Sequence, residues 1–281
     1  GKCLHQLDVN PDDILISNKL GWVRKQLTTS EPTFEPGVWH NLKFDAEQKI
    51  GYDGILECWD QGNELLGGRY IPQLLSVHDP DEYLALANDE QAEGKLLNNI
   101  LDAYQALSDL KKQGKAKAIG VGAKNWRTIE LISRHVKLDW VMLANSYTIM
   151  NHPPELLKFI EALNKKHIKI INSAVFHGGF LTGSSYFDYK PVNIESHPSL
   201  FHWREEFNTI CKKHDIKPSD ACISFGMSGP GVIAISLNTS NPERIKDNVN
   251  SVLTKLPREF YIDMVNAGLI SNNYLNIALE K

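Results

Sequence analysis

The feature that most constrains the fold is the alternation of short apolar runs with long amphipathic segments along all 281 residues. The apolar runs have the length of strands and contain few polar residues, which is typical of strands buried on both faces of a parallel sheet. The amphipathic segments repeat apolar residues at intervals of three and four, as helices with one buried face do. We predict strands at residues 14–18, 73–78, 118–122, 140–145, 168–174 and 232–237. We predict helices at residues 46–66, 96–113, 126–135, 154–166, 200–214, 219–228 and 242–256.

Strands that alternate with helices indicate βαβ units and a parallel sheet, so the predicted fold class is α/β, a (β/α)8 TIM barrel. No linker or low-complexity segment interrupts residues 1–281, and we expect one barrel domain over that range. Only six of the eight units can be found, and six strands alone would leave two long edges unpaired. We therefore expect an N-terminally incomplete barrel without its first two β/α units. The irregular stretch 183–198 is expected to form a loop over one barrel face.

Composition excludes several classes of protein. The net charge is −4 and the isoelectric point is near 6.2, so there is no basic surface for nucleic acid. No apolar run approaches the roughly 20 residues of a membrane helix, and no charged-then-apolar leader opens the chain. The cysteines are widely spaced and form no metal-ligand pattern, which indicates free thiols in a reducing compartment and a cytoplasmic location. They are Cys3, Cys58, Cys211 and Cys222.

Common catalytic and nucleotide-binding motifs are absent or incomplete. The glycine pair at 120 and 122 follows a predicted strand, but Asn125 stands where a dinucleotide fingerprint needs its third glycine. The stretch 226–230 resembles a nucleophile elbow until its last residue, Pro230. The histidines are scattered and no HExxH motif is present, so neither a zinc hydrolase nor a metal-dependent sugar isomerase has a visible ligand set. We predict no metal.

Two basic residues occupy the positions where α/β barrels carry their active sites, the C-terminal ends of strands. Lys19 follows the predicted strand 14–18, and His78 ends the predicted strand 73–78. A lysine that emerges from an apolar strand is costly unless a carboxylate pairs with it. The alternatives are that Lys19 is a solvated loop lysine and that His78, with Asp79 and Pro80 after it, caps the next segment.

Four motifs in the right order resemble the aldo-keto reductase family. They are ILISNKLG at 14–21, LLSVHDPDEY at 74–83, KAIGVG at 117–122 and NTSNPERIKDN at 238–248. The HDPD form is similar to the branch that contains D-threo-aldose (galactose, L-fucose) 1-dehydrogenases and pyridoxal 4-dehydrogenases. The resemblance runs in register from about residue 1 to residue 256. It implies a barrel that binds NAD or NADP without a Rossmann domain and exchanges a hydride with a carbonyl compound.

The resemblance also assigns roles in proton transfer. In the family a tyrosine exchanges the proton at the carbonyl oxygen, a lysine paired with an aspartate lowers the pKa of that tyrosine, and a histidine orients the oxygen. Lys19 and His78 match the lysine and the histidine. The family's tyrosine and aspartate lie upstream of the lysine, where this sequence has no tyrosine and only Asp8, Asp12 and Asp13 in a predicted turn. We therefore expect the proton-transfer half of the site to be absent from this chain.

The resemblance extends to the cofactor-binding tail. Arg244 and Asn248 match residues that hold the adenosine phosphate and the adenine, and Asn238 stands where NADP-preferring members carry a lysine. The loss of that cation favours NAD modestly over NADP. The family's Ser-Asn pair is replaced by Gly122 and Ala123, which leaves Asn125 or Asn145 to hold the carboxamide. The position of the family's aromatic residue that stacks on nicotinamide falls near Ser173 in this sequence. Phe176 is the nearest aromatic replacement, and the alternative is that Phe176 is a core residue. The predicted cofactor residues are Asn125, Asn145, Ser173, Phe176, Asn238, Ser240, Arg244 and Asn248.

For the substrate we predict a sugar such as L-fucose or a related aldehyde, in carbohydrate metabolism. Trp22, Phe176 and His177 are the predicted pocket walls because aromatic faces suit the CH face of a sugar, although Trp22 is equally typical of a core. The principal hypothesis is an NAD(P)-dependent aldose dehydrogenase or aldehyde reductase. The alternative is a catalytically silent cofactor-binding barrel that acts as a sensor or partner subunit. Open strands would also favour association into a homo-oligomer.

Overall fold

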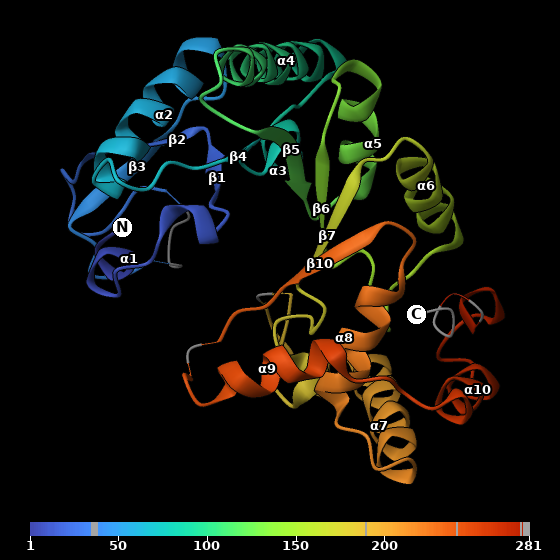
Figure 1. Cartoon of the computed structure of the whole chain (residues 1–281). Coiled ribbons are helices and arrows are strands. Elements are labelled where there is room, and N and C mark those ends of the chain that lie inside the picture. The colour runs from blue at the N-terminus through green and yellow to red at the C-terminus, as the bar shows by residue number, and fades with distance from the viewer. Residues whose placement is uncertain (35–38, 189, 240, 276, 278–281) are drawn as a thin grey trace. The chain divides into compact units, whose positions relative to one another are not determined.

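The computed structural model describes residues 1–34, 39–188, 190–239, 241–275 and 277, and the chain divides into two compact units (Figure 1). Unit 1 comprises Gly1–Ala123 and Arg127–Trp140, and unit 2 comprises Lys124–Trp126 and Val141–Lys281. Strands and helices alternate in both units, as the apolar pattern predicts. Within the described residues, no helix combines the length and the apolarity needed to cross a bilayer.

Unit 1 is built around strands that hydrogen-bond in the order β1-β4-β5, with β4 parallel to both neighbours. Helices α2 and α4 pack against each other, α2 also contacts β1, and α4 contacts β4 and β5. The elements are α1 (Lys2–Gln6), β1 (Ser17–Leu20), β2 (Trp22–Gln26), β3 (Phe44–Gln48), α2 (Tyr52–Leu66), β4 (Leu74–Val77), α3 (Pro80–Leu84), α4 (Glu90–Lys112), β5 (Ala118–Ala123) and α5 (Trp126–His135), of which Trp126 belongs to unit 2.

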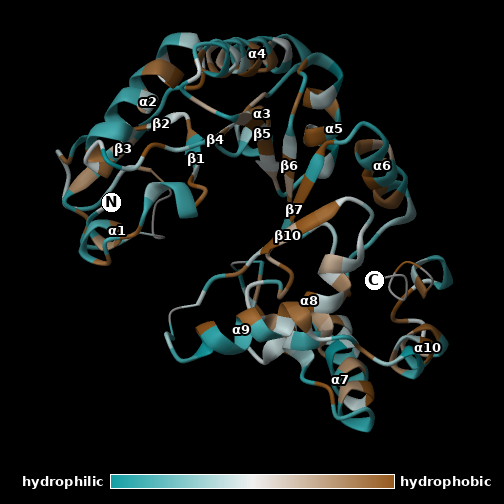
Figure 2. Ribbon diagram, in the orientation of Figure 1, coloured by the Kyte–Doolittle hydropathy of each residue, from teal (hydrophilic) through white to brown (hydrophobic). Residues whose placement is uncertain are grey.

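Unit 2 has strands in the order β6-β7-β10, and β10 runs parallel to β7. Helix α8 packs against β7, β10 and α9, and α7 contacts α8 and α10. Figure 2 shows β10 in hydrophobic colours and α4 of unit 1 as mostly hydrophilic. The elements are β6 (Trp140–Ala144), α6 (Pro154–Lys165), β7 (Lys169–Ser173), β8 (Tyr186–Phe187), β9 (Lys190–Pro191), α7 (Pro198–Lys213), α8 (Pro218–Ser228), β10 (Val232–Ser236), α9 (Arg244–Leu253) and α10 (Arg258–Asn266).

Two predicted elements of unit 1 are wrong in their bounds. The strand expected at 14–18 is β1, which begins at Ser17, because the ladder with β4 pairs Ser17 with Leu74 and buries Leu20 while Leu15 stays exposed. Lys19 therefore lies within the strand rather than after it. The helix expected at 46–66 begins at Tyr52, because β3 pairs with β2 in an antiparallel hairpin. Strand β2 lacks apolar alternation, and β3 buries Asp45 while Phe44 stays exposed, which is opposite to the usual pattern of a half-buried strand.

Smaller differences have local causes. Helix α4 begins at Glu90 rather than at residue 96, because the Asp89 side chain caps it by accepting a hydrogen bond from the Ala92 amide at 2.7 Å. The stretch 183–198 contains the short β8–β9 ladder. Helix α10 was not predicted.

The glycine motif at 120–122 lies inside β5. A Cβ at Gly120 would overlap the ring of Trp140, so the strand needs a residue without a side chain there. Packing therefore accounts for this glycine, in agreement with the rejection of a dinucleotide fingerprint.

Candidate active site

Lys19 and His78 meet at the same end of two neighbouring strands in unit 1. Lys19 is in register with Ser76 on the parallel strand β4, and residues in register point to the same face of a sheet. His78 follows Ser76 by two positions, and its amide donates to the Leu20 carbonyl at 2.8 Å, which extends the ladder. The structure thus brings together the two predicted catalytic residues of this unit.

A carboxylate that sequence reasoning did not select joins the two. Oδ1 of Asp79 lies 3.4 Å from Nζ of Lys19, and Oδ2 lies 3.4 Å from Nε2 of His78. Burial raises the pKa of Asp79, but the hydrogen bond and charge of His78, followed by those of Lys19, outweigh it and lower the pKa to about 2. The sequence feature that could have identified Asp79 is its position directly after His78 in the HDPD motif. Asp79 lies downstream of Lys19, whereas the aspartate of the resembled family lies upstream of its lysine.

The lowered pKa of Asp79 predicts a pH-dependent contribution to stability. A carboxyl whose folded pKa is depressed stabilises the fold above its unfolded pKa near 4, and that contribution is lost as the pH falls through about 2. We expect Asp79→Asn to lower the free energy of unfolding by about 2 kcal/mol near pH 5 and by less at about pH 3. Urea unfolding of the wild type and the variant at the two pH values measures the difference in the free energy of unfolding. A difference that does not change with pH would contradict the prediction.

A cavity of about 310 Å³ in unit 1 is lined by both Lys19 and Trp22. The Trp22 ring packs against Phe34 at 5.8 Å between centroids, and the Arg24 guanidinium lies 4.2 Å from the centroid of Phe44. The cavity therefore combines aromatic walls with cationic groups. The other lining residues are Asn18, Asp45, Ala46, Cys58, Gln61, Gly62 and Leu65.

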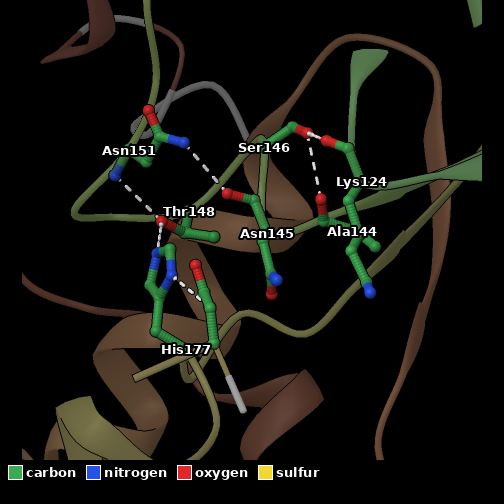
Figure 3. A network of polar contacts seen from close by, with 8 residues as sticks. Lys124, Ala144, Asn145, Ser146, Thr148, Asn151 and His177 are labelled. Atoms are coloured by element: carbon green, nitrogen blue, oxygen red, sulfur yellow. Dashed lines mark hydrogen bonds and ion pairs between the residues drawn. The ribbon is translucent and has the colours of Figure 1, made fainter. Parts of the chain in front are cut away.

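In unit 2, the ends of β6 and β7 bring Asn145 and Ser173 together. The Asn145 amide donates to the Ser173 carbonyl at 3.3 Å, and the Asn145 carbonyl accepts from Nδ2 of Asn151 at 3.0 Å. Asn145 has a left-handed backbone with φ of 57°. Its side-chain Oδ1 is buried and has no hydrogen-bond partner among the described residues, and Figure 3 shows the side chain pointing away from Asn151. An unsatisfied buried acceptor is costly unless a ligand donates to it.

The turn after β7 is held by a second polar chain (Figure 3). Nε2 of His177 lies 2.8 Å from Oγ1 of Thr148, and Nδ1 lies 2.9 Å from Oδ1 of Asp188. The His177 ring is 2% exposed and stacks on Phe187 at 4.7 Å. Its polar atoms thus tie the turn to the segment after β6. No signal in the sequence linked Thr148 and Asp188 to it.

Asn172, also absent from the predicted set, organises the end of β7. Its fully buried side chain donates to the carbonyls of Tyr147 and Gly226 at 2.7 and 2.9 Å, and its Oδ1 accepts from the Ser173 amide at 3.0 Å. A Cβ at Gly226 would lie 3.1 Å from the Asn172 amide, so a glycine permits this close approach. Asn172 therefore hydrogen-bonds to three backbone groups, one on each of three segments.

The remaining predicted residues lie on unit 2. Arg244 and Asn248 stand four positions apart near the start of α9, on the same helix face. Arg244 and Asn238 are exposed, and Asn248 is half-buried. Asn125 is an exposed residue between β5 and α5, and Phe176 is half-buried in the turn after β7. Ser240 lies outside the described residues.

The comparisons with known proteins agree with one another. A family model described as "Aldo/keto reductase family" matches residues 1–267. Pyridoxal 4-dehydrogenase of Microbacterium luteolum is 27% identical over 293 aligned positions, which cover 96% of this chain and 82% of that protein. D-threo-aldose 1-dehydrogenase of a Pseudomonas species is 25% identical over 77% of this chain, and the match spans 62% of that relative.

Solved structures show the same fold. An aldo-keto reductase from Bacillus halodurans, in its holo form, matches with a TM-score of 0.63 and 14% identity over 95% of this chain and 76% of its own. A thermostable aldo-keto reductase in complex with the inhibitor epalrestat matches with a TM-score of 0.54 over 79% of this chain. The predicted α/β fold of the barrel class is thereby confirmed, and at these identities the likeness bears on the fold alone.

Proposed function

Because the chain belongs to the aldo/keto reductase family, we propose that it is an NAD(P)-dependent oxidoreductase that moves a hydride between a nicotinamide and the carbonyl carbon of a sugar or related aldehyde. The observation that carries the proposal is the meeting of Lys19 and His78 at one carboxylate, at the ends of neighbouring parallel strands. Such strand ends are where α/β barrels perform their chemistry.

Lys19 and His78 supply hydrogen-bond donors for the substrate oxygen. An ammonium and an imidazole N–H directed at that oxygen stabilise the negative charge that develops on it when the carbonyl carbon is reduced. In the oxidative direction the same donors hold the alkoxide-like oxygen. The two residues therefore act as the catalytic pair of the proposed site.

The residues at the ends of β6 and β7 fit a nicotinamide. A bound nicotinamide cofactor supplies the acceptor or donor of the hydride. The unpartnered Oδ1 of Asn145 is an acceptor suited to the carboxamide N–H, and Ser173 lies beside it. Phe176 is the proposed stacking residue, Asn125 is a second candidate for the carboxamide, and His177 holds the turn that carries Phe176.

The start of α9 is the proposed site for the adenosine end of the cofactor. Arg244 is an exposed cation in the first turn, and Asn248 lies on the same face with an amide suited to a base. Asn238 carries no charge to pair with a 2′-phosphate, so we propose that NAD binds better than NADP. Ser240, in the same tail motif, is a further candidate.

We expect Arg244→Ala to weaken NAD binding by about 10-fold, because one charge-assisted hydrogen bond to phosphate is lost. Titration of the tryptophan fluorescence with NAD measures the dissociation constant. Arg258→Ala is the matched control, since Arg258 is the first residue of the next helix, α10. Equal affinities of the Arg244→Ala variant and the wild type would count against the assignment.

Aldoses and related aldehydes are the proposed substrates. The cavity beside Lys19 has Trp22, Phe34 and Phe44 among its walls, and aromatic faces pack well on the CH face of a sugar or on a flat ring. The two relatives are named for pyridoxal and for D-threo-aldoses. The four cysteines are free, which supports a reducing compartment such as the cytoplasm.

A turnover assay tests the proposal. The protein is incubated with NAD or NADP and with L-fucose, D-threo-aldoses or pyridoxal, and the absorbance of the reduced nicotinamide is followed. We expect turnover with at least one of these compounds and a preference for NAD. Cofactor binding without turnover on any of them would instead favour the silent cofactor-binding barrel.

A further inference from the structure

Asp79 occupies a position from which one side chain reaches both basic groups of the proposed site. We propose that Asp79 is a positioning residue: its carboxylate bridges Lys19 and His78 and fixes the positions of the two side chains at the strand ends, beside the proposed substrate site. This inference rests on the proposed function and deepens it, because it names the group that sets the geometry of the pair.

The two contacts use different oxygens of the carboxylate. Nζ of Lys19 lies 3.4 Å from Oδ1, and Nε2 of His78 lies 3.4 Å from Oδ2. The two contacts therefore do not compete for one oxygen, and Asp79 can hold Lys19 and His78 at the same time. A long lysine side chain that is 44% exposed has many rotamers available in solvent, and a fixed negative charge favours the few that keep it beside His78.

The backbone at Asp79 is shaped for this bridge. Asp79 has φ of 44° and ψ of 57°, a left-handed conformation that L-residues adopt at a cost. It directly precedes α3, where a capping aspartate would have an extended backbone and would accept a hydrogen bond from the helix. The Asp79 side chain makes no such capping bond. The carboxylate is turned back to β1 and His78 instead, so helix capping does not account for it.

Two substitutions remove the carboxylate in different ways. Asp79→Asn keeps the shape, whereas Asp79→Gly suits the left-handed backbone and removes the side chain without backbone strain. We expect both to lower kcat by roughly 10- to 100-fold while KM and the dissociation constant of NAD stay within a few-fold. Asp79→Glu is expected to restore part of kcat. The control is Asp109→Asn, which removes a carboxylate whose pKa is also lowered and which pairs with Lys112 at 3.2 Å.

A second readout does not depend on activity. The imidazole nitrogen resonances of His78 are recorded without cofactor, together with a thermal melt that checks folding. We expect the chemical shifts of these His78 nitrogens to change in Asp79→Asn and Asp79→Gly and to be unchanged in Asp109→Asn. If the wild type transfers no hydride, the proposed function is wrong. The His78 chemical shifts would still show whether Asp79 bridges Lys19 and His78. Unchanged kcat and unchanged resonances in a folded Asp79→Gly variant would overturn the inference.

Discussion

Replacement of Lys19 by methionine is expected to lower kcat by about 100- to 1,000-fold, equivalent to about 3 to 4 kcal/mol of lost transition-state stabilisation. Methionine keeps most of the length and apolar contact of lysine but removes the ammonium from beside Asp79 and from the substrate oxygen. The affinity for NAD should stay within a few-fold, since Lys19 is not among the residues proposed to bind the cofactor. Steady-state kinetics and fluorescence titration measure the two effects.

Lys25→Met provides the control for this prediction. Lys25 lies on β2, its side chain is 43% exposed, and it is 3.9 Å from the carboxylate of Asp45, so its surroundings resemble those of Lys19. It does not line the cavity that Lys19 shares with Trp22. We expect this variant to keep the wild-type kcat. If the two lysine variants lose the same amount of activity, general destabilisation rather than chemistry explains the loss.

Asn172→Leu is expected to lower the free energy of unfolding by about 3 to 5 kcal/mol. The substitution keeps the number of side-chain heavy atoms and the branch at Cγ but leaves the carbonyls of Tyr147 and Gly226 and the amide of Ser173 without their partner in a buried site. Each buried unsatisfied group costs about 1 to 3 kcal/mol. Urea unfolding followed by circular dichroism measures the change.

The comparison for Asn172 is an asparagine in solvent. Asn208→Leu, on an exposed position of α7, should change stability by no more than about 0.5 kcal/mol. A loss of less than about 1 kcal/mol for Asn172→Leu would mean that water or a repacked side chain satisfies the three groups.

Much of the fold follows from patterns that act locally. Buried strands such as β5 and β6 are short runs of apolar residues, and the helix at Trp126–His135 has a strongly one-sided apolar face, so their positions could be predicted with errors of one or two residues. The hairpin of β2 and β3 was not predicted because its stability comes from pairing between Trp22–Gln26 and Phe44–Gln48, and in β3 the buried residue is Asp45 while Phe44 is exposed. Pairing over such a separation has no signature within either strand.

The same distinction applies to the site. Lys19 and His78 could be identified because each accompanies an apolar strand within a motif. Asp79 was noted only as the residue that follows His78, and its left-handed backbone and its two contacts show where the carboxylate is directed. Asn172 follows two isoleucines in β7, and the sequence of that strand gives no indication of the three backbone groups that its side chain contacts. These roles depend on contacts between segments that are distant in sequence.

The most direct test of hydride transfer uses an aldose deuterated at C1. The protein is incubated with this sugar and oxidised NAD, and the reduced cofactor is analysed by mass spectrometry. We expect the deuterium to appear in the reduced nicotinamide with the wild type and to be nearly absent with Lys19→Met. Reduced cofactor without the label, or no reduced cofactor from a protein that binds NAD and is supplied with the D-threo-aldoses and pyridoxal in turn, would contradict the assignment of this chain as a dehydrogenase.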